Sequence, residues 1–263
     1  MLEFGAPTLI ELESTRDTAA LCAKLGLKFI ELNMSFPQYQ PECMDVEKLE
    51  KIKRDYGVYY TVHIDESLDP CSVNKDIAEV YTQTMLKTVD IARKLQIPSL
   101  NMHLLRGIYV TLPECRTYVY AENEQLYLDS FRVFRDKVTE AIGNADIHVS
   151  IENTDGYDLP FLRHALDLLL ESPAFSLTYD IGHDYAVNNI DKPEILKRSD
   201  RLHHMHMHDA LGTKVHRALG DGEMDIQEYL SLAKEHNCRV VMETKTVDAL
   251  KKSVEWLKAH GEM

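Results

Sequence analysis

The stretch Leu202-His203-His204-Met205-His206-Met207-His208-Asp209 concentrates imidazoles and a carboxylate among apolar residues, and no glycine or proline interrupts it. Read as a β-strand, its alternation places His204, His206 and His208 on one face. A single buried histidine is more often only hydrogen-bonded, but several imidazoles on one face, with an aspartate at the end, favour a metal or catalytic site. The stretch therefore predicts a fold that brings further ligands to its histidine face.

The composition is that of a globular chain with a sizeable core, since 44% of its 263 residues are hydrophobic and 27% are charged. Such a length fits one α/β barrel of roughly 250 residues. The formal net charge of −14 would repel a polyphosphate backbone, which argues against a nucleic-acid partner.

Several features predict a cytoplasmic protein without a membrane partner. The five cysteines are odd in number, widely spaced and free of a CxxC motif, as expected for reduced thiols rather than a disulfide framework. The N-terminal residues lack the basic and apolar regions of a signal peptide. No apolar run approaches the roughly 18 residues that would suggest a membrane span.

Strand-like segments alternate with segments of helical periodicity, eight of each, along the whole chain. This alternation predicts an α/β fold, a single-domain (β/α)₈ TIM barrel over residues 1–263. We expect a long loop over Leu104–Ala121, and we expect Gly26 and Gly57 to end helices. The predicted strands are Leu2–Thr8, Phe29–Asn33, Val58–Ile64, Pro98–His103, Ile147–Glu152, Phe175–Asp180, the histidine strand and Arg239–Glu243. The predicted helices are Thr15–Leu25, Val46–Tyr56, Val73–Leu95, Glu122–Gly143, Leu159–Leu170, Pro193–Ser199, Ile226–Glu235 and Val247–His260.

Side chains of metal-ligand type end six consecutive predicted strands. In TIM barrels the catalytic groups lie at the C-terminal ends of the strands. Any one of these residues could be a helix cap, a surface carboxylate or a hydrogen-bonded histidine. Their placement at the same end of successive strands instead predicts a metal site. The residues are His63, His103, Glu152, Asp180, His206 with Asp209, and Glu243.

Five motifs resemble those of the xylose isomerase-like TIM barrel superfamily. This superfamily includes sugar and sugar phosphate isomerases and epimerases, inosose dehydratases, and the endonuclease IV-like nucleases of AP endonuclease family 2. The order of the motifs and their strand positions indicate the superfamily rather than one of its members. The motifs are Glu152-Asn153-Thr154, Asp180-Ile181-Gly182-His183, His206-Met207-His208-Asp209, His216-Arg217-Ala218-Leu219-Gly220-Asp221-Gly222 and Glu243-Thr244.

The resemblance to the epimerase branch implies one divalent metal, Mn²⁺, Mg²⁺, Co²⁺ or Zn²⁺, held by Glu152, Asp180, His206 and Glu243. Three carboxylates and one imidazole suit Mn²⁺ or Mg²⁺ better than a closed structural zinc site. The metal would act as a Lewis acid on a substrate carbonyl. Glu152 and Glu243 would be the catalytic groups that remove and return a proton on opposite faces of the neighbouring carbon. The residues expected to contact substrate are His183, His208, His216 and Arg217.

The resemblance to the nuclease branch implies further metal ligands. His63 and His103 match two of them, and His183 and His216 match two more. The position of the remaining aspartate ligand is Lys214, and a protonated lysine cannot bind a metal, so the third zinc site is incomplete. Two metals roughly 3.5–4 Å apart would support phosphoester hydrolysis. The acidic charge then favours a small phosphodiester substrate over DNA.

Three cationic side chains have competing interpretations. Arg106 and Arg116 could bind phosphate beside the tyrosines of the same long loop, but an ordinary lid loop is the favoured interpretation. Lys245 could hold a phosphate or carboxylate, but a solvated lysine is favoured there.

We therefore predict a metal-dependent isomerase or epimerase acting on a sugar or sugar phosphate. A metal-dependent phosphoester hydrolase is the alternative, favoured by His63 and His103, and a non-catalytic metal-binding protein is a third reading. Within the histidine strand, His206 is the predicted ligand, His204 lies deeper and His203 faces the surrounding helices. A homo-oligomer is compatible with the sequence.

Overall fold

The computed structural model describes residues 2–263, which form a closed barrel of eight parallel strands. The order around the barrel is β1-β12-β9-β8-β7-β4-β3-β2, so neighbouring strands follow one another along the chain. The predicted single-domain (β/α)₈ TIM barrel is confirmed. The barrel strands are β1 (Glu3–Pro7), β2 (Phe29–Asn33), β3 (Tyr59–His63), β4 (Ser99–His103), β7 (His148–Glu152), β8 (Phe175–Asp180), β9 (Leu202–Met207) and β12 (Arg239–Met242).

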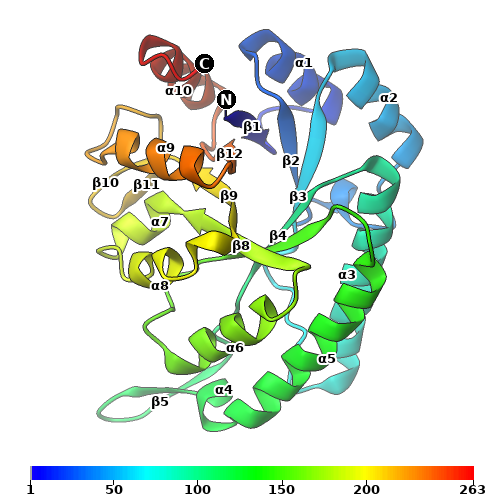
Figure 1. Cartoon of the computed structure of the whole chain (residues 1–263), viewed down its shortest axis with the longest axis vertical. Helices are drawn as coiled ribbons and strands as arrows, with labels where there is room; N and C mark the ends of the chain where they lie inside the picture. The colour runs from blue at the N-terminus through cyan, green and yellow to red at the C-terminus, as the bar shows by residue number, and fades with distance from the viewer. Residues whose placement is uncertain (1) are drawn as a thin grey trace.

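Helices connect successive strands and surround the barrel (Figure 1). The side chains of Ser14, Asp45 and Asn74 cap helix N-termini by accepting backbone N–H bonds. The predicted C-caps Gly26 and Gly57 adopt the left-handed conformation, with φ of 89° and 67°. Within residues 2–263, no helix combines the length and apolarity needed to cross a bilayer. The main connecting helices are α1 (Thr15–Leu25), α2 (Val46–Tyr56), α3 (Lys75–Leu95), α5 (Glu124–Ile142), α6 (Pro160–Leu170), α9 (Ile226–Glu235) and α10 (Val247–Ala259).

The segment between β4 and α5 is more regular than the long loop that the sequence predicted. Strands β5 (Tyr109–Thr111) and β6 (Arg116–Tyr118) form an antiparallel hairpin, and α4 (Val119–Glu122) follows it. Figure 1 shows this hairpin projecting beyond the helices near α4 and α6. Elements of three or four residues are too short for hydrophobic periodicity to detect, so the sequence analysis missed them.

The connection after β8 also differs from the prediction. Helix α7 (Ile181–Ala186) begins immediately after the strand, and α8 (Lys192–Leu196) replaces the expected helix Pro193–Ser199. The Asp180 side chain caps α7 by accepting the backbone N–H of His183. The strand end and the helix start therefore share one residue, and no turn sequence separates them.

The predicted histidine strand divides in two. Strand β9 ends at Met207, and the chain continues into a hairpin of β10 (Asp209–Leu211) and β11 (Lys214–Arg217). This hairpin lies beside α7 (Figure 1). The alternation predicted for the strand holds, because His204 and His206 are buried inside the barrel while His203 is half-exposed against the His148 ring.

The inward-facing side chains of the barrel are largely polar between the Phe29 ring and the C-terminal ends of the strands. The Phe29 ring is fully buried beside Gly5, its register partner on β1, and a Cβ at Gly5 would overlap that ring. Ser150 links Ser99 and Ser176 through hydroxyl hydrogen bonds of 3.1 Å and 2.8 Å. Inward-facing polar side chains above Phe29 therefore lead up to the strand ends.

A buried carboxylate network fixes the segments that follow β7 and β8. Asp184 accepts hydrogen bonds from the Tyr179 hydroxyl at 2.7 Å and the Asp191 N–H at 2.8 Å. Asp191 Oδ1 accepts the Tyr157 N–H at 2.7 Å, while its Oδ2 is buried without a partner in the described part of the chain. Burial, together with the nearby Asp184 charge, raises the pKa of Asp191 to about 6.

We expect Asp191→Asn to change the pH dependence of stability. Because the folded-state pKa is raised, the aspartate's contribution is fully present below its unfolded pKa near 4 and is lost as pH rises through about 6. The variant avoids this loss, so from pH 4 to pH 7.5 its free energy of unfolding should rise relative to wild type by about 1–3 kcal/mol. Denaturant unfolding at both pH values measures this difference. Parallel pH profiles of variant and wild type would contradict it.

Candidate metal centre

The C-terminal ends of β7, β8, β9 and β12 bring four side chains around one point. His206 Nδ1 lies 3.3 Å from Glu152 Oε1, 3.4 Å from Glu243 Oε2 and 3.9 Å from Asp180 Oδ2. Glu152, Asp180 and His206 are buried, and the Glu243 side chain is 12% exposed. These are the four residues that the sequence analysis assigned to the metal.

Three of these atoms are buried without any hydrogen-bond partner among residues 2–263. They are Asp180 Oδ2, His206 Nδ1 and Glu243 Oε2. A buried polar atom left unpaired costs about 1–3 kcal/mol, so three at one place require a common partner. Lone pairs from carboxylates and one imidazole, with Glu152 Oε1 beside them, are a donor set that a divalent cation satisfies. The residues present therefore fit a divalent metal ion.

The negative charges of the clustered carboxylates favour a cation at the same point. Burial lowers the pKa of His206, but the carboxylates of Glu152, Glu31 and Glu243 raise it well above its ordinary value. Burial likewise raises the pKa of Glu152, but His206 and His103 hold it well below its ordinary value. The carboxylates thus surround the point that His206 Nδ1 faces with negative charge, which a divalent cation would neutralise.

Asp180 is oriented so that one oxygen is free. Its Oδ1 accepts the His183 N–H at 2.7 Å, and its own N–H donates to Asn153 Oδ1 at 2.7 Å. The Asn153 amide returns a hydrogen bond to the Asp180 carbonyl at 3.1 Å. Asn153, the residue after β7, thereby fixes Asp180 at the end of β8, and Asp180 Oδ2 is left facing His206.

Glu31 supports His206 from below, and the sequence analysis missed it. Glu31 Oε2 lies 3.0 Å from His206 Nε2, while its Oε1 accepts from His204 Nε2 at 3.0 Å and from the Thr61 hydroxyl at 3.2 Å. Burial raises the pKa of Glu31, but the His206 and His204 imidazoles lower it below its ordinary value. Glu31 lies in the middle of β2, so a search of strand ends passes over it. The available signal was a charged residue on an otherwise apolar strand.

His63 and His103, which the resemblance to the nuclease branch adds to the ligand set, lie beside the other oxygen of Glu152. Glu152 Oε2 lies 3.4 Å from His63 Nε2 and 3.1 Å from His103 Nε2, and it also accepts from the Asn101 amide. His63 Nδ1 donates to the Ile64 carbonyl at 2.8 Å, which fixes the ring with Nε2 facing Glu152. Glu152 therefore faces His206 with one oxygen and two more imidazoles with the other.

The histidines expected to contact substrate form a second group beside Glu243. His183 Nε2 and His216 Nε2 lie 3.2 Å apart, and His216 Nδ1 donates to the Glu243 carbonyl at 3.0 Å. Both side chains line the central cavity. His208 is brought to the same place but is fully buried, and it is not among the residues that line the cavity.

Asp209 and Arg217 are held by other groups. Asp209 was expected among the strand-end ligands, and the structure contradicts this, because its two oxygens accept backbone N–H bonds from Ala210, Gly220, Gly222 and Met224. Asp209 thus anchors the loop after β11 rather than a metal. Arg217 donates to the Asp221 carbonyl at 2.7 Å and does not line the cavity, so its substrate contact stays a prediction.

A cavity of about 460 Å³ opens above the cluster. Arg106 lines it and donates to the Thr154 carbonyl at 2.8 Å, whereas Arg116 lies outside, 4.7 Å from the Tyr109 ring centroid. Lys245 is exposed to solvent, as the sequence favoured, and its Nζ also lies 2.8 Å from Glu243 Oε1. The cavity residues are His63, Glu66, His103, Arg106, Glu152, Asn153, Thr154, Asp155, His183, His216, Glu243 and Lys245.

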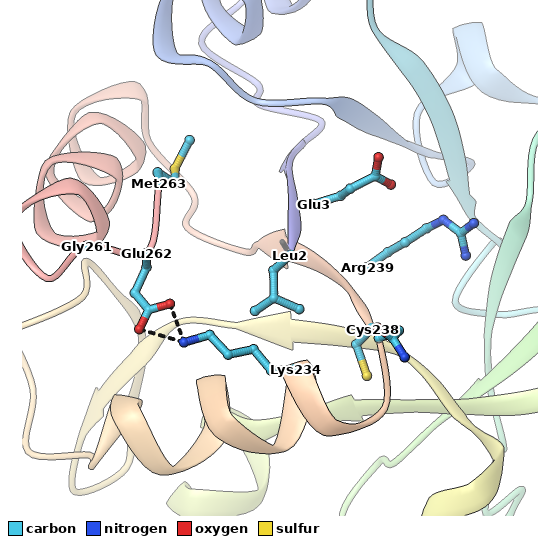
Figure 2. Close-up of a pocket in the computed structure, with 9 residues that line it drawn as sticks. Leu2, Glu3, Lys234, Cys238, Arg239, Gly261, Glu262 and Met263 are labelled. Atoms are coloured by element: carbon cyan, nitrogen blue, oxygen red, sulfur yellow. Dashed lines mark hydrogen bonds and ion pairs between the residues drawn. The ribbon is translucent and has the colours of Figure 1, made fainter.

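A larger hollow, of about 540 Å³, lies at the opposite end of the barrel. Figure 2 shows that its side chains come from the start of β1, the end of α9 and the chain terminus. Lys234 and Glu262 form an ion pair of 2.7 Å there. None of the strand-end ligands reaches this hollow, so size does not identify the functional site.

The chain matches the family model described as the xylose isomerase-like TIM barrel over residues 19–260. No curated protein sequence matches it.

Solved structures with the same fold include several sugar epimerases. A D-tagatose 3-epimerase-like protein has a TM-score of 0.79 and 21% identity, over 99% of this chain and 97% of that chain. The D-allulose 3-epimerase from Methylomonas sp. in complex with D-allulose has a TM-score of 0.73 and 16% identity, over 98% and 96%. The IOLI protein with a binding zinc atom has a TM-score of 0.74 and 12% identity, over 99% and 96%. At these identities the likeness establishes the fold.

We expect Glu31→Gln to weaken metal binding by about 10–100-fold, because the carboxylate that orients His206 and strengthens its basicity is lost. Competition with a coloured chelator measures the Mn²⁺ and Zn²⁺ affinities. Glu66→Gln, a change of the same kind in an exposed cavity residue, is the matched control and should leave the affinities unchanged. Equal affinities for Glu31→Gln and wild type would show that Glu31 does not support the site.

Proposed function

Because the chain belongs to the xylose isomerase-like TIM barrel family, we propose that it is a divalent-metal-dependent isomerase or epimerase. The substrate class is a sugar or sugar phosphate with a carbonyl group beside a hydroxyl-bearing carbon. The metal is Zn²⁺ or Mn²⁺, with Mg²⁺ and Co²⁺ as further candidates. The sugar epimerases and the zinc-bound neighbour of the same fold support this proposal.

The observation that carries the proposal is the convergence of Glu152 and Glu243 on His206 Nδ1, at 3.3 Å and 3.4 Å. Two carboxylates that flank one point can act on the two faces of a carbon held between them. Asp180 Oδ2 completes the donor set on a third side. The combination suits a reaction in which a proton leaves one face and returns to the other.

The bound metal would supply a Lewis acid that makes the C–H beside the substrate carbonyl more acidic. One of the glutamates removes this proton, and the other returns it from the opposite face. Asn101, His63 and His103 fix the Glu152 carboxylate through its second oxygen, and Lys245 fixes Glu243 through Oε1. Each carboxylate is thus held in place beside the point where the metal would bind.

The cavity has the size and polarity for a small hydroxylated substrate. Its volume of about 460 Å³ lies within the range of small-molecule sites. His183 and His216 present ring nitrogens to the cavity, where they can exchange hydrogen bonds with substrate hydroxyls. Arg106 adds a cationic side chain for a phosphate or an oxygen-rich end of the substrate.

A phosphoester hydrolase is the second candidate, and His63 and His103 favour it. Both Nε2 atoms face Glu152 Oε2, so a second metal could share Glu152 with the first. Lys214 is exposed at the position where the nuclease-like set requires an aspartate, which argues against a three-zinc site. The net charge of −14 again favours a small phosphodiester over DNA.

The proposal predicts exchange of a substrate proton with solvent. Metal-loaded protein in D₂O should incorporate deuterium beside the carbonyl of ketoses such as D-allulose or D-tagatose, as followed by proton NMR. Glu152→Gln and Glu243→Gln should each reduce the rate by about 10²–10⁴-fold, because each removes a proton-transfer group. Metal content is measured in parallel, and Glu79→Gln, an exposed residue of α3 outside the cavity, is the control. Absence of exchange across neutral and phosphorylated ketoses and aldoses would oppose the proposal.

Metal stoichiometry separates the two candidate functions. For the isomerase, elemental analysis should give one tightly bound ion per chain, and His63→Ala and His103→Ala should leave that number unchanged. Two ions per chain, with hydrolysis of a small phosphodiester that is lost in either variant, would replace the isomerase by the hydrolase.

A further inference from the structure

We propose that His208 is a positioning residue whose Nε2–H holds Asp180 in its metal-binding orientation, and that His208 binds neither metal nor substrate. The inference rests on the metal centre proposed above. It assigns a role to an imidazole that lies among the ligands without belonging to them.

The His208 ring is locked by its surroundings. It is fully buried directly after β9, with ring centroids 4.3 Å from His216 and 5.5 Å from His183. A Cβ at Gly182 would overlap the ring, so the absence of a side chain there is what admits the imidazole. With the ring fixed, the role of each nitrogen follows from what it faces.

The backbone N–H of His216 donates to His208 Nδ1 at 2.9 Å. A neutral imidazole has one N–H and one lone pair, so a lone pair at Nδ1 places the proton on Nε2. The Asp209 carbonyl also lies 3.4 Å from Nδ1. The shorter contact decides the tautomer, because a backbone amide cannot give up its proton, and a proton on Nδ1 would face it directly.

The remaining nitrogen of His208 faces the carboxylates of the centre. Nε2 lies 3.2 Å from Asp180 Oδ1 and 3.9 Å from Glu243 Oε2, and it makes no hydrogen bond among residues 2–263. A protonated Nε2 has no lone pair for a metal, which excludes His208 as a ligand despite its position. Its proton can instead reach Asp180 Oδ1, the oxygen that already accepts the His183 N–H. The His183 N–H bonds Oδ1 and His208 Nε2 lies close to the same oxygen, so Oδ2 is left as the oxygen for the metal.

The arrangement couples the β10–β11 hairpin to the metal centre. His216 adopts the left-handed conformation, with φ of 57°, and in this conformation its N–H reaches His208 while its ring lines the cavity. Displacement of the hairpin would remove the hydrogen bond that fixes the His208 tautomer. The orientation of Asp180 therefore depends on a segment that contributes no metal ligand.

Metal affinities of single variants test the role of the Nε2 proton. His208→Met fills a similar space without a donor and should weaken Mn²⁺ binding by about 10–100-fold. His208→Gln places an amide N–H near Nε2 and should recover most of the affinity. His203→Met, on the outward face of the same strand, is the matched control and should bind as wild type does. A double-mutant cycle combines Gly182→Ala with His208→Ala. Gly182→Ala should weaken Mn²⁺ binding when His208 is present and should have little effect in the His208→Ala background.

A tautomer measurement gives a readout that a purely structural role would not change. Long-range ¹H–¹⁵N NMR of histidine-labelled protein should show His208 unprotonated at Nδ1 and protonated at Nε2, both without metal and with Zn²⁺. Loss of the Nε2 proton on zinc binding would identify His208 as a ligand and overturn the inference. His208→Met binding equal to wild type would overturn the inference alone. Failure of wild type to bind any divalent metal would overturn the proposed function as well.

Discussion

Buried lone pairs that lack a donor are the constraint on which the rest of this structure depends. Asp180 Oδ2, His206 Nδ1 and Glu243 Oε2 share one point, and the surrounding polar network directs them there. Glu31 supports His206 from below and Asn153 fixes the Asp180 backbone. Three buried atoms without a hydrogen bond destabilise the folded barrel, and a cation bound at the shared point would remove this destabilisation. The binding free energy of the ion and the stability of the fold are therefore linked.

The strand-end ligands could be predicted because parallel strands of a barrel all end on the same face. That rule placed His63, His103, Glu152 and Asp180 together before any distance was known. In the structure the first three line one cavity, and Asp180 is buried near His206. It also included Asp209, which follows a strand but gives its oxygens to backbone amides. The position of a residue along its strand determines how far along the barrel axis it lies. Its hydrogen-bond partners, however, depend on the conformation of the loops, which the hydrophobic pattern of the sequence does not predict.

The residues that sequence reasoning missed act through other residues. Glu31 lies in mid-strand, and its role follows from being level with the His206 ring rather than from any motif. The tautomer of His208 depends on the positive φ of His216, a backbone conformation that the local sequence does not predict. The short elements β5, β6 and α7 lay below the length at which periodicity is informative. The sequence therefore predicted which residues could bind a metal, whereas the residues that orient those ligands were identified only in the structure.

The Phe29 ring affects how small molecules can reach the cavity above the ligands. It occupies the barrel beside Gly5 and stacks on Tyr59 with centroids 5.2 Å apart, so the hollow in Figure 2 and the cavity above the ligands are separate compartments. For the proposed isomerase, substrate would enter and product would leave through the same opening of the cavity. The rate of product release would then limit how soon the next substrate can bind.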